Sequence, residues 1–146
     1  MKLPDDFREF LKSLNKHQVR YLLIGGYAVG IYGYPRATGD MDIWVANDAD
    51  NAHRLVKAIC QFGFELPDVK PELFLKADAI VRMGLPPLRI ELFMSITGLQ
   101  FDECYRRREI KLVDEIRVTV IDLQNLIKNK QAVGRHKDLD DIEHLT

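Results

Sequence analysis

The sequence predicts an α/β fold of the α+β type, in which a small mixed β-sheet is flanked by helices. Apolar runs of strand length alternate along the chain with segments whose apolar residues recur at helical spacing. Glycine, proline and aspartate stand at the points where these runs end. A chain of 146 residues is long enough for a substantial core, and no linker divides it. We therefore expect a single domain over residues 1–146.

The N-terminal half is predicted to contain three helices and two strands. The first helix follows Pro4, a residue suited to a first turn, and its apolar face consists of Leu3, Phe7, Phe10, Leu11 and Leu14. The other expected elements are a buried strand over 19–24, a short helix over 26–32, a strand over 41–46, and a helix between the caps Asn47–Asp48 and Gly63.

The C-terminal half is predicted to contain four strands and two helices, while residues 64–76 fit neither pattern. The expected elements are strands over 79–82 and 88–93 joined by residues 84–87, a hairpin of 109–113 and 116–121 around Asp114-Glu115, a helix capped by Asp122, and, after Gly134, a final helix with Leu139, Ile142 and Leu145 on one side.

Composition excludes several classes of partner. The net charge of −1 does not indicate attraction of the whole protein to nucleic acid or to an anionic membrane. No apolar segment approaches the length of a membrane span, and the acidic N-terminus is unlike a signal peptide. Cys60 and Cys104 match no zinc or redox spacing. We therefore expect a reduced, cytoplasmic protein with no membrane partner.

The most informative feature is a pair of acids two residues apart. Side chains alternate faces along a strand, so Asp40 and Asp42 are expected on one face of the strand over 41–46. Two neighbouring carboxylates repel each other, and a divalent cation relieves that repulsion. Hard oxygen ligands suit Mg²⁺, or Mn²⁺ in its place.

Two further features complete a candidate site. Gly25-Gly26 follows an apolar strand and opens a predicted helix, where bare backbone N–H groups can hold a phosphate. Glu91 lies in an otherwise apolar strand, where an unpaired carboxylate is costly, so it is the best candidate for a third acid. The alternative is that Glu91 is the ion partner of Arg89, which lies on the same strand face.

In this order, Gly25-Gly26, Arg36-x-Thr38-x-Asp40-x-Asp42 and the later Glu91 resemble the polymerase-beta-type nucleotidyltransferase superfamily. The closer resemblance is to its small bacterial and archaeal branch that includes AbiEii-type toxins, in which a C-terminal segment similar to residues 134–145 recurs. The resemblance implies nucleotide-binding roles for Gly25, Gly26, Arg36, Thr38, Arg135 and Lys137, and metal-binding and catalytic roles for Asp40, Asp42 and Glu91.

Two departures from the family pattern leave alternatives open. Gly26 stands where serine is usual, and Glu91 stands where aspartate is usual, so a nucleotide-binding but inactive member is a second hypothesis. Arg36 could pair with Asp40 instead of a phosphate, and Arg135 and Lys137 could simply belong to a charged helix.

The leading hypothesis is metal-dependent transfer of a nucleoside monophosphate from a nucleoside triphosphate to an acceptor hydroxyl on RNA (a tRNA, for example), a protein or a small molecule. A partner chain could supply the acceptor-binding surface. The alternative is an inactive nucleotide-binding or toxin–antitoxin partner module on the same fold. The third hypothesis is purely structural: the acids are solvated and the glycines only form turns.

Overall fold

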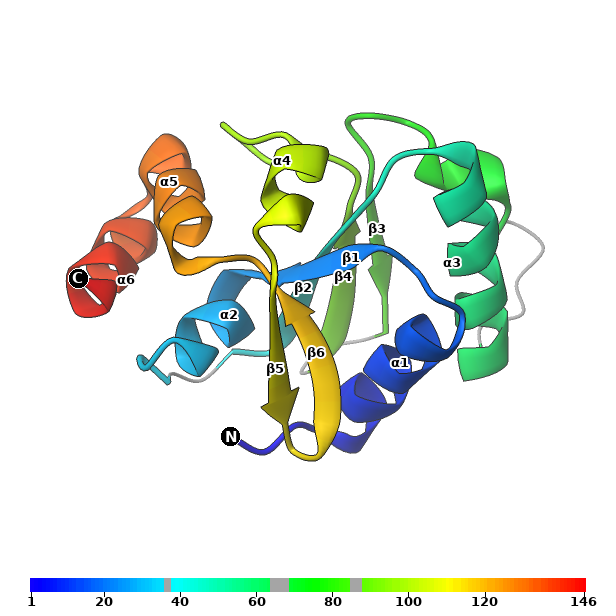
Figure 1. The fold of residues 1–146 in the computed structure, drawn as a ribbon, viewed down its shortest axis with the longest axis horizontal. Coiled ribbons are helices and arrows are strands. Elements are labelled where there is room, and N and C mark those ends of the chain that lie inside the picture. Colours follow the sequence, from blue (N-terminus) through cyan, green and yellow to red (C-terminus); the bar gives the residue numbers. More distant parts are fainter. Residues whose placement is uncertain (36–37, 64–68, 85–87) are drawn as a thin grey trace.

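We describe the fold from a computed structural model, for residues 1–35, 38–63, 69–84 and 88–146. A six-stranded mixed sheet forms the centre of the molecule and helices flank it (Figure 1), which confirms the predicted fold class. The strands are β1 (Tyr21–Ile24), β2 (Asp40–Val45), β3 (Ile80–Met83), β4 (Arg89–Phe93), β5 (Glu109–Val113) and β6 (Ile116–Val120). The helices are α1 (Asp5–Lys16), α2 (Gly25–Ile31), α3 (Ala49–Phe62), the short 3₁₀ helix η1 (Pro71–Phe74), α4 (Phe101–Arg106), α5 (Leu123–Val133) and α6 (His136–Leu145).

The strands lie in the order β3-β4-β2-β1-β6-β5. Three neighbouring pairs are antiparallel, namely β3 with β4, β2 with β1, and β6 with β5. The two pairs between them, β4 with β2 and β1 with β6, are parallel. The central strand β1 is buried along its whole length, as expected for an apolar run covered on both faces. The edge strands β3 and β5 carry exposed residues.

Helix α1 buries the apolar face that the sequence predicts. Asp5 and Asp6 occupy its first turn, where acidic side chains interact favourably with the helix dipole. It packs against α3 (Figure 1), where the rings of Phe10 and Phe62 meet edge to face with centroids 5.2 Å apart. No helix in the described part of the chain is both long and apolar enough to cross a membrane.

The buried amide of Asn51 joins α3 to the ends of two strands. Its Oδ1 accepts a hydrogen bond from the Arg20 amide at 2.7 Å, and its Nδ2 donates to the carbonyls of Arg20 and Ala46 at 3.1 and 3.0 Å. The backbone N–H of Asn51 donates to Asp48 Oδ1 at 2.9 Å, so the predicted cap at Asp48 is confirmed. These bonds satisfy backbone groups where β1 begins and β2 ends.

The predicted C-terminal helix is present as α6, but its most buried side chains are not those of the predicted apolar side. Leu139 is 51% exposed, whereas Asp138 and Asp141 are almost completely buried. The reason is Lys130 of α5, itself buried, whose Nζ lies 3.1 Å from Asp138 Oδ1 and 2.9 Å from Asp141 Oδ2. Arg135 adds a 2.7 Å contact from Nε to Asp138 Oδ2. Paired buried charges, not apolar spacing, therefore orient α6.

Helix α4 is not predicted, because the sequence pattern indicates no element between residues 93 and 109. Because α4 has only six residues, it is too short to give a recurring helical pattern. Its buried side chain is that of Cys104. Helix η1 lies inside the 64–76 segment that fits neither pattern. Part of that segment, 64–68, and most of the predicted 84–87 connection lie outside the described residues.

We predict that Lys130→Met destabilises the protein strongly. The substitution removes the buried cation that Asp138 and Asp141 share, and breaking a buried ion pair in this way costs about 3–5 kcal/mol. Lys128→Met is the matched control, because Lys128 lies on the same helix and is exposed, so its effect should stay within about 0.5 kcal/mol. Urea unfolding of both variants measures the difference, and equal midpoints would contradict the role given to Lys130.

Candidate functional site

The two acids of β2 lie on one face of the strand, as predicted. Met41 and Ile43 alternate with them and are fully buried, whereas Asp40 and Asp42 are partly accessible. This alternation follows from the period of two along a strand. Both carboxylates can therefore meet a ligand above the same face of the sheet.

Glu91 stands beside Asp42 because β2 and β4 pair in parallel. The register sets Asp42 opposite Glu91 and Asp40 opposite Arg89. In neighbouring strands, residues that stand opposite each other direct their side chains to the same face. The third acid predicted from the sequence is thus brought into one cluster with the first two.

The glycine turn lies on the other side of Asp42. Ile24, the last residue of β1, pairs with Asp42, so Gly25 follows at the same level of the sheet. A Cβ atom built on Gly25 would lie 2.4 Å from Asp42 Oδ2, and the φ angle of Gly25 is +67°. Both the close approach and the left-handed backbone require glycine here.

Gly26 and Thr38 also converge on this point. A Cβ on Gly26 would lie 3.2 to 3.3 Å from the side chain of Thr38. The Thr38 hydroxyl donates to the backbone carbonyl of Asp40 at 3.3 Å, so Thr38 supports the start of β2. Arg36, predicted to contact a phosphate, lies outside the described residues.

Two arginines engage two of the three acids. Arg89 donates from Nε to Asp40 Oδ1 at 3.1 Å and from Nη2 to Asp40 Oδ2 at 3.3 Å. Its Nη2 lies 3.7 Å from Glu91 Oε1, while Nε of Arg82 lies 3.3 Å from Glu91 Oε2. The predicted alternative, an ion pair of Arg89 with Glu91, is therefore present, but the two-pronged contact of Arg89 is with Asp40.

The pKa values of the two aspartates are shifted in opposite directions. Hydrogen bonding from Arg89 lowers the pKa of Asp40. The pKa of Asp42 is raised to about 7, chiefly by burial and then by the charges of Glu91 and Asp40, against a smaller opposing effect of Lys137 and Lys130. Asp42 is therefore the acid whose negative charge is least compensated by the protein.

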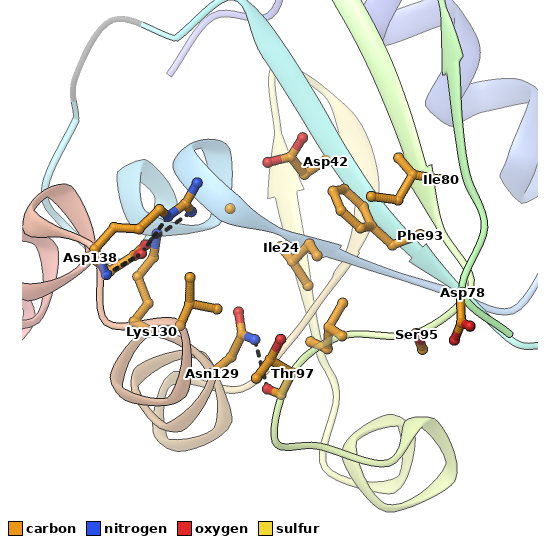
Figure 2. Close-up of a pocket in the computed structure, with 14 residues that line it drawn as sticks. Ile24, Asp42, Asp78, Ile80, Phe93, Ser95, Thr97, Asn129, Lys130 and Asp138 are labelled. Atoms are coloured by element: carbon orange, nitrogen blue, oxygen red, sulfur yellow. Dashed lines mark hydrogen bonds and ion pairs between the residues drawn. The ribbon is translucent and has the colours of Figure 1, made fainter.

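A cavity of about 410 Å³ opens beside Asp42 and Gly25. Figure 2 shows Asp42 at one end of it, Lys130 and Asp138 on one side, and Ile80 and Phe93 on the other. Arg135 also lines this cavity, whereas Lys137 acts on the acids through its charge. The structure thus brings the predicted C-terminal basic residues toward the acidic cluster.

Sequence reasoning missed other residues of the site. Arg82 stands opposite Glu91 in the β3–β4 ladder. The sequence predicts the hairpin of these two strands, but the pairing of Arg82 with Glu91 follows only once the register of the hairpin is known. The cavity wall includes Phe93 and Thr97, and Asn129 Nδ2 donates to the Thr97 carbonyl at 3.0 Å (Figure 2). Asn129 and Thr97 lie in separate segments, and no local pattern relates them.

The donor set suits a divalent cation in its chemistry. Three carboxylates, two on β2 and one on β4, share one face of the sheet, and the charges of two of them raise the pKa of the third. A bound cation would relieve this repulsion. In the described residues, however, no three histidine, cysteine, aspartate or glutamate side chains are arranged to hold a metal ion. Both Asp40 oxygens accept a hydrogen bond from Arg89, so Arg89 competes with a cation for Asp40.

Several solved structures have a similar fold. A candidate nucleotidyltransferase of Thermotoga maritima superposes with a TM-score of 0.62 at 12% identity, over 94% of this chain and 88% of that one. The lincosamide antibiotic adenylyltransferase LnuA, in its lincomycin-bound form, gives 0.62 at 11% identity, over 98% and 96%. An antigenic nucleotidyltransferase-like protein of Paracoccidioides brasiliensis gives 0.57 at 16% identity, over 95% and 73%.

No model of a protein family matches the chain, and no curated protein matches its sequence. At these low identities the similarity concerns the fold. The mixed sheet and its flanking helices agree with the predicted fold class and with these neighbours. The chain has a nucleotidyltransferase-like fold.

Proposed function

We propose that the protein binds a nucleoside triphosphate beside the acidic cluster and transfers its nucleoside monophosphate to an acceptor hydroxyl. The observation that carries the proposal is the packing of Gly25 against Asp42, with Glu91 opposite Asp42 on the next strand. Carboxylates beside a glycine turn match the motif series, and the nucleotidyltransferase-like fold supports the same activity. The AbiEii-like branch remains the family branch that we propose.

The residues have distinct proposed roles. The Gly25–Gly26 turn accommodates the triphosphate, because the absence of side chains lets a phosphate approach the backbone. Arg135, and Lys137 through its charge, add positive potential on the cavity side. Phe93 and Ile80 give the cavity an apolar wall against which a base can pack.

Asp40, Asp42 and Glu91 are the proposed ligands of Mg²⁺ or Mn²⁺, which when bound neutralises charge on the triphosphate and on the leaving pyrophosphate. Glu91 orients the acceptor hydroxyl and accepts its proton. The acceptor oxygen forms a bond to the α-phosphorus as the bond to pyrophosphate breaks. The acceptor belongs to an RNA, a protein or a small molecule.

A second candidate function is an inactive nucleotide-binding or toxin–antitoxin partner module. The observation that favours it is the engagement of Asp40 by Arg89 and of Glu91 by Arg82. Permanently paired carboxylates would not bind a cation well. The two functions differ in whether the nucleoside monophosphate is transferred from the nucleotide to an acceptor.

We predict that Asp40→Asn with Asp42→Asn abolishes transfer and weakens Mn²⁺ binding, because neutral amides are poor ligands for hard cations. The assay incubates the full chain with each α-labelled nucleoside triphosphate, Mg²⁺ or Mn²⁺, and a cell extract as acceptor source. Mn²⁺ affinity is measured separately by electron paramagnetic resonance.

The control is Asp50→Asn, an acid-to-amide change on the exposed surface of α3, where Asp50 pairs only with Arg54 among the contacts described. It should leave label transfer and Mn²⁺ affinity unchanged. Transfer that persists in the double variant would refute the role of the acids. Nucleotide binding without any transfer by the native chain would favour the inactive module.

The raised pKa of Asp42 predicts a pH dependence. A carboxyl with a native-state pKa of about 7 and an ordinary value of about 3.9 in the unfolded chain makes the native state less stable as pH rises between these values. The loss then levels off above pH 7 or so. We expect Asp42→Asn to raise the melting temperature progressively over this interval when no divalent cation is present.

The measurement is thermal unfolding of both proteins across the pH range in a chelating buffer. Asp50→Asn again serves as the control, and its effect should not vary over the same interval. Adding Mn²⁺ to the native chain above neutral pH should recover stability that the Asp42→Asn variant does not gain. A constant difference between native chain and Asp42→Asn at every pH would contradict the assignment.

We predict that Arg89→Gln strengthens Mn²⁺ binding about tenfold, since removing a charge-assisted hydrogen bond frees Asp40 from a competing cation. Arg54→Gln, which breaks the exposed 3.0 Å pair with Asp50, is the control and should have no effect. Weaker binding in Arg89→Gln would instead mean that Arg89 positions Asp40 for the cation. Titration with Mn²⁺ distinguishes the two outcomes.

A further inference from the structure

The edge strand β5 exposes two large apolar side chains at the end of the sheet. Ile110 is 52% exposed and Leu112 is 75% exposed, and both point to the same face because they are two residues apart. Within the six-stranded order, β5 pairs only with β6. Long apolar side chains on an open edge strand are uncommon, since such edges readily pair with another chain.

The backbone N–H and C=O groups of β5 are oriented so that such pairing is possible. The β5–β6 hairpin closes with Asp114 and Glu115 at φ angles of +49° and +67°, and Val113 stands opposite Ile116. A two-residue turn of this kind makes the closing pair hydrogen-bonded, and bonded pairs alternate from there. The N–H and C=O groups of Ile110 and Leu112 therefore point away from β6, toward the open edge.

The charges of β5 then select one register for pairing with a second copy. A two-fold axis at Ile110 sets Glu109 opposite the partner's Lys111, and Lys111 opposite the partner's Glu109. Moving the axis to Lys111 would set two lysines against each other, which is destabilising. Both axes use the outward-facing backbone groups of Ile110, so the charges decide between the two registers.

The charged pair is held on its own face of the strand. Lys111 Nζ lies 3.9 Å from Glu109 Oε2, and it also lies 5.6 Å from the centre of the Tyr32 ring. The Tyr32 hydroxyl donates to Glu109 Oε2 at 2.5 Å. Both charges are thus lined up along one side of the edge, while Ile110 and Leu112 occupy the other.

We propose that β5 is a self-association surface, at which two copies of the chain pair their β5 strands antiparallel about a two-fold axis at Ile110. The occupant is a second copy because the edge is complementary to itself in charge, in hydrogen-bond phase and in its exposed apolar residues. Isologous pairing of this kind closes as a dimer. A contact between two short edges buries little area, so the dimer is weak.

The test is a charge exchange followed by sedimentation velocity, from low micromolar to near-millimolar concentrations of the full chain. Glu109→Lys alone or Lys111→Glu alone sets like charges opposite each other at two symmetric positions, so each should weaken dimerisation about tenfold. The double exchange restores opposite pairs and should return the dissociation constant to within about threefold of the native value.

Ile110→Asp gives a second arm that does not touch the charged pair. It sets two carboxylates together at the axis, and it should abolish the dimer while the exposed position leaves the monomer folded, as circular dichroism will show. Ile80→Asp, at a 42% exposed position on the opposite edge strand β3, is the matched control and should leave dimerisation intact.

A native chain that stays monomeric throughout the concentration range overturns the proposal. A dimer that tolerates Ile110→Asp overturns it as well, because the contact then lies elsewhere. A dimer lost in both single exchanges but not recovered in the double exchange rejects the register. A different protein retained on β5 by a chain that is itself monomeric would make the edge a heterologous docking surface and reject self-association.

Discussion

The parallel pairing of β2 with β4 is the constraint on which the site depends. Strand β2 alone places two carboxylates on one face, but the register with β4 decides which side chains stand beside them. A shift of one residue would turn the side chains of one strand to the opposite face. It would separate Glu91 from Asp42 and remove Arg89 from Asp40. The chemistry of the cluster is therefore set by a pairing between strands far apart in the sequence.

This arrangement concentrates negative charge, and the fold compensates it unevenly. Arg89 and Arg82 neutralise Asp40 and Glu91 through direct contacts, whereas the lysines Lys137 and Lys130 act on Asp42 through their charge at longer range. The close approach of Gly25 to Asp42 leaves no room for a neutralising side chain there. An uncompensated carboxylate reduces stability, and such a cost is commonly found where a site is built to receive a ligand.

The sequence predicts what short-range periodicity determines. The common face of Asp40 and Asp42 follows from two-residue spacing, and the β5–β6 hairpin follows from the turn at Asp114-Glu115. It does not predict the Arg89–Asp40 contact, because that contact needs the β2–β4 register. Nor does it predict the exposure of Leu139, since the orientation of α6 depends on the buried charge of Lys130. Interactions across the sheet and between buried charges are not visible in local patterns.

The strand order also limits what self-association can contribute to the site. Strands β6 and β1 lie between β5 and β2, so at about 4.8 Å per strand the partner's β5 would lie roughly 19 Å from β2. A second copy on β5 therefore does not complete the acidic cluster, and each copy keeps its own cavity. A partner chain that supplies the acceptor surface would therefore have to bind elsewhere than β5. This geometry makes dimerisation and the proposed transfer separable, because a variant at Ile110 changes the first without touching a residue of the second.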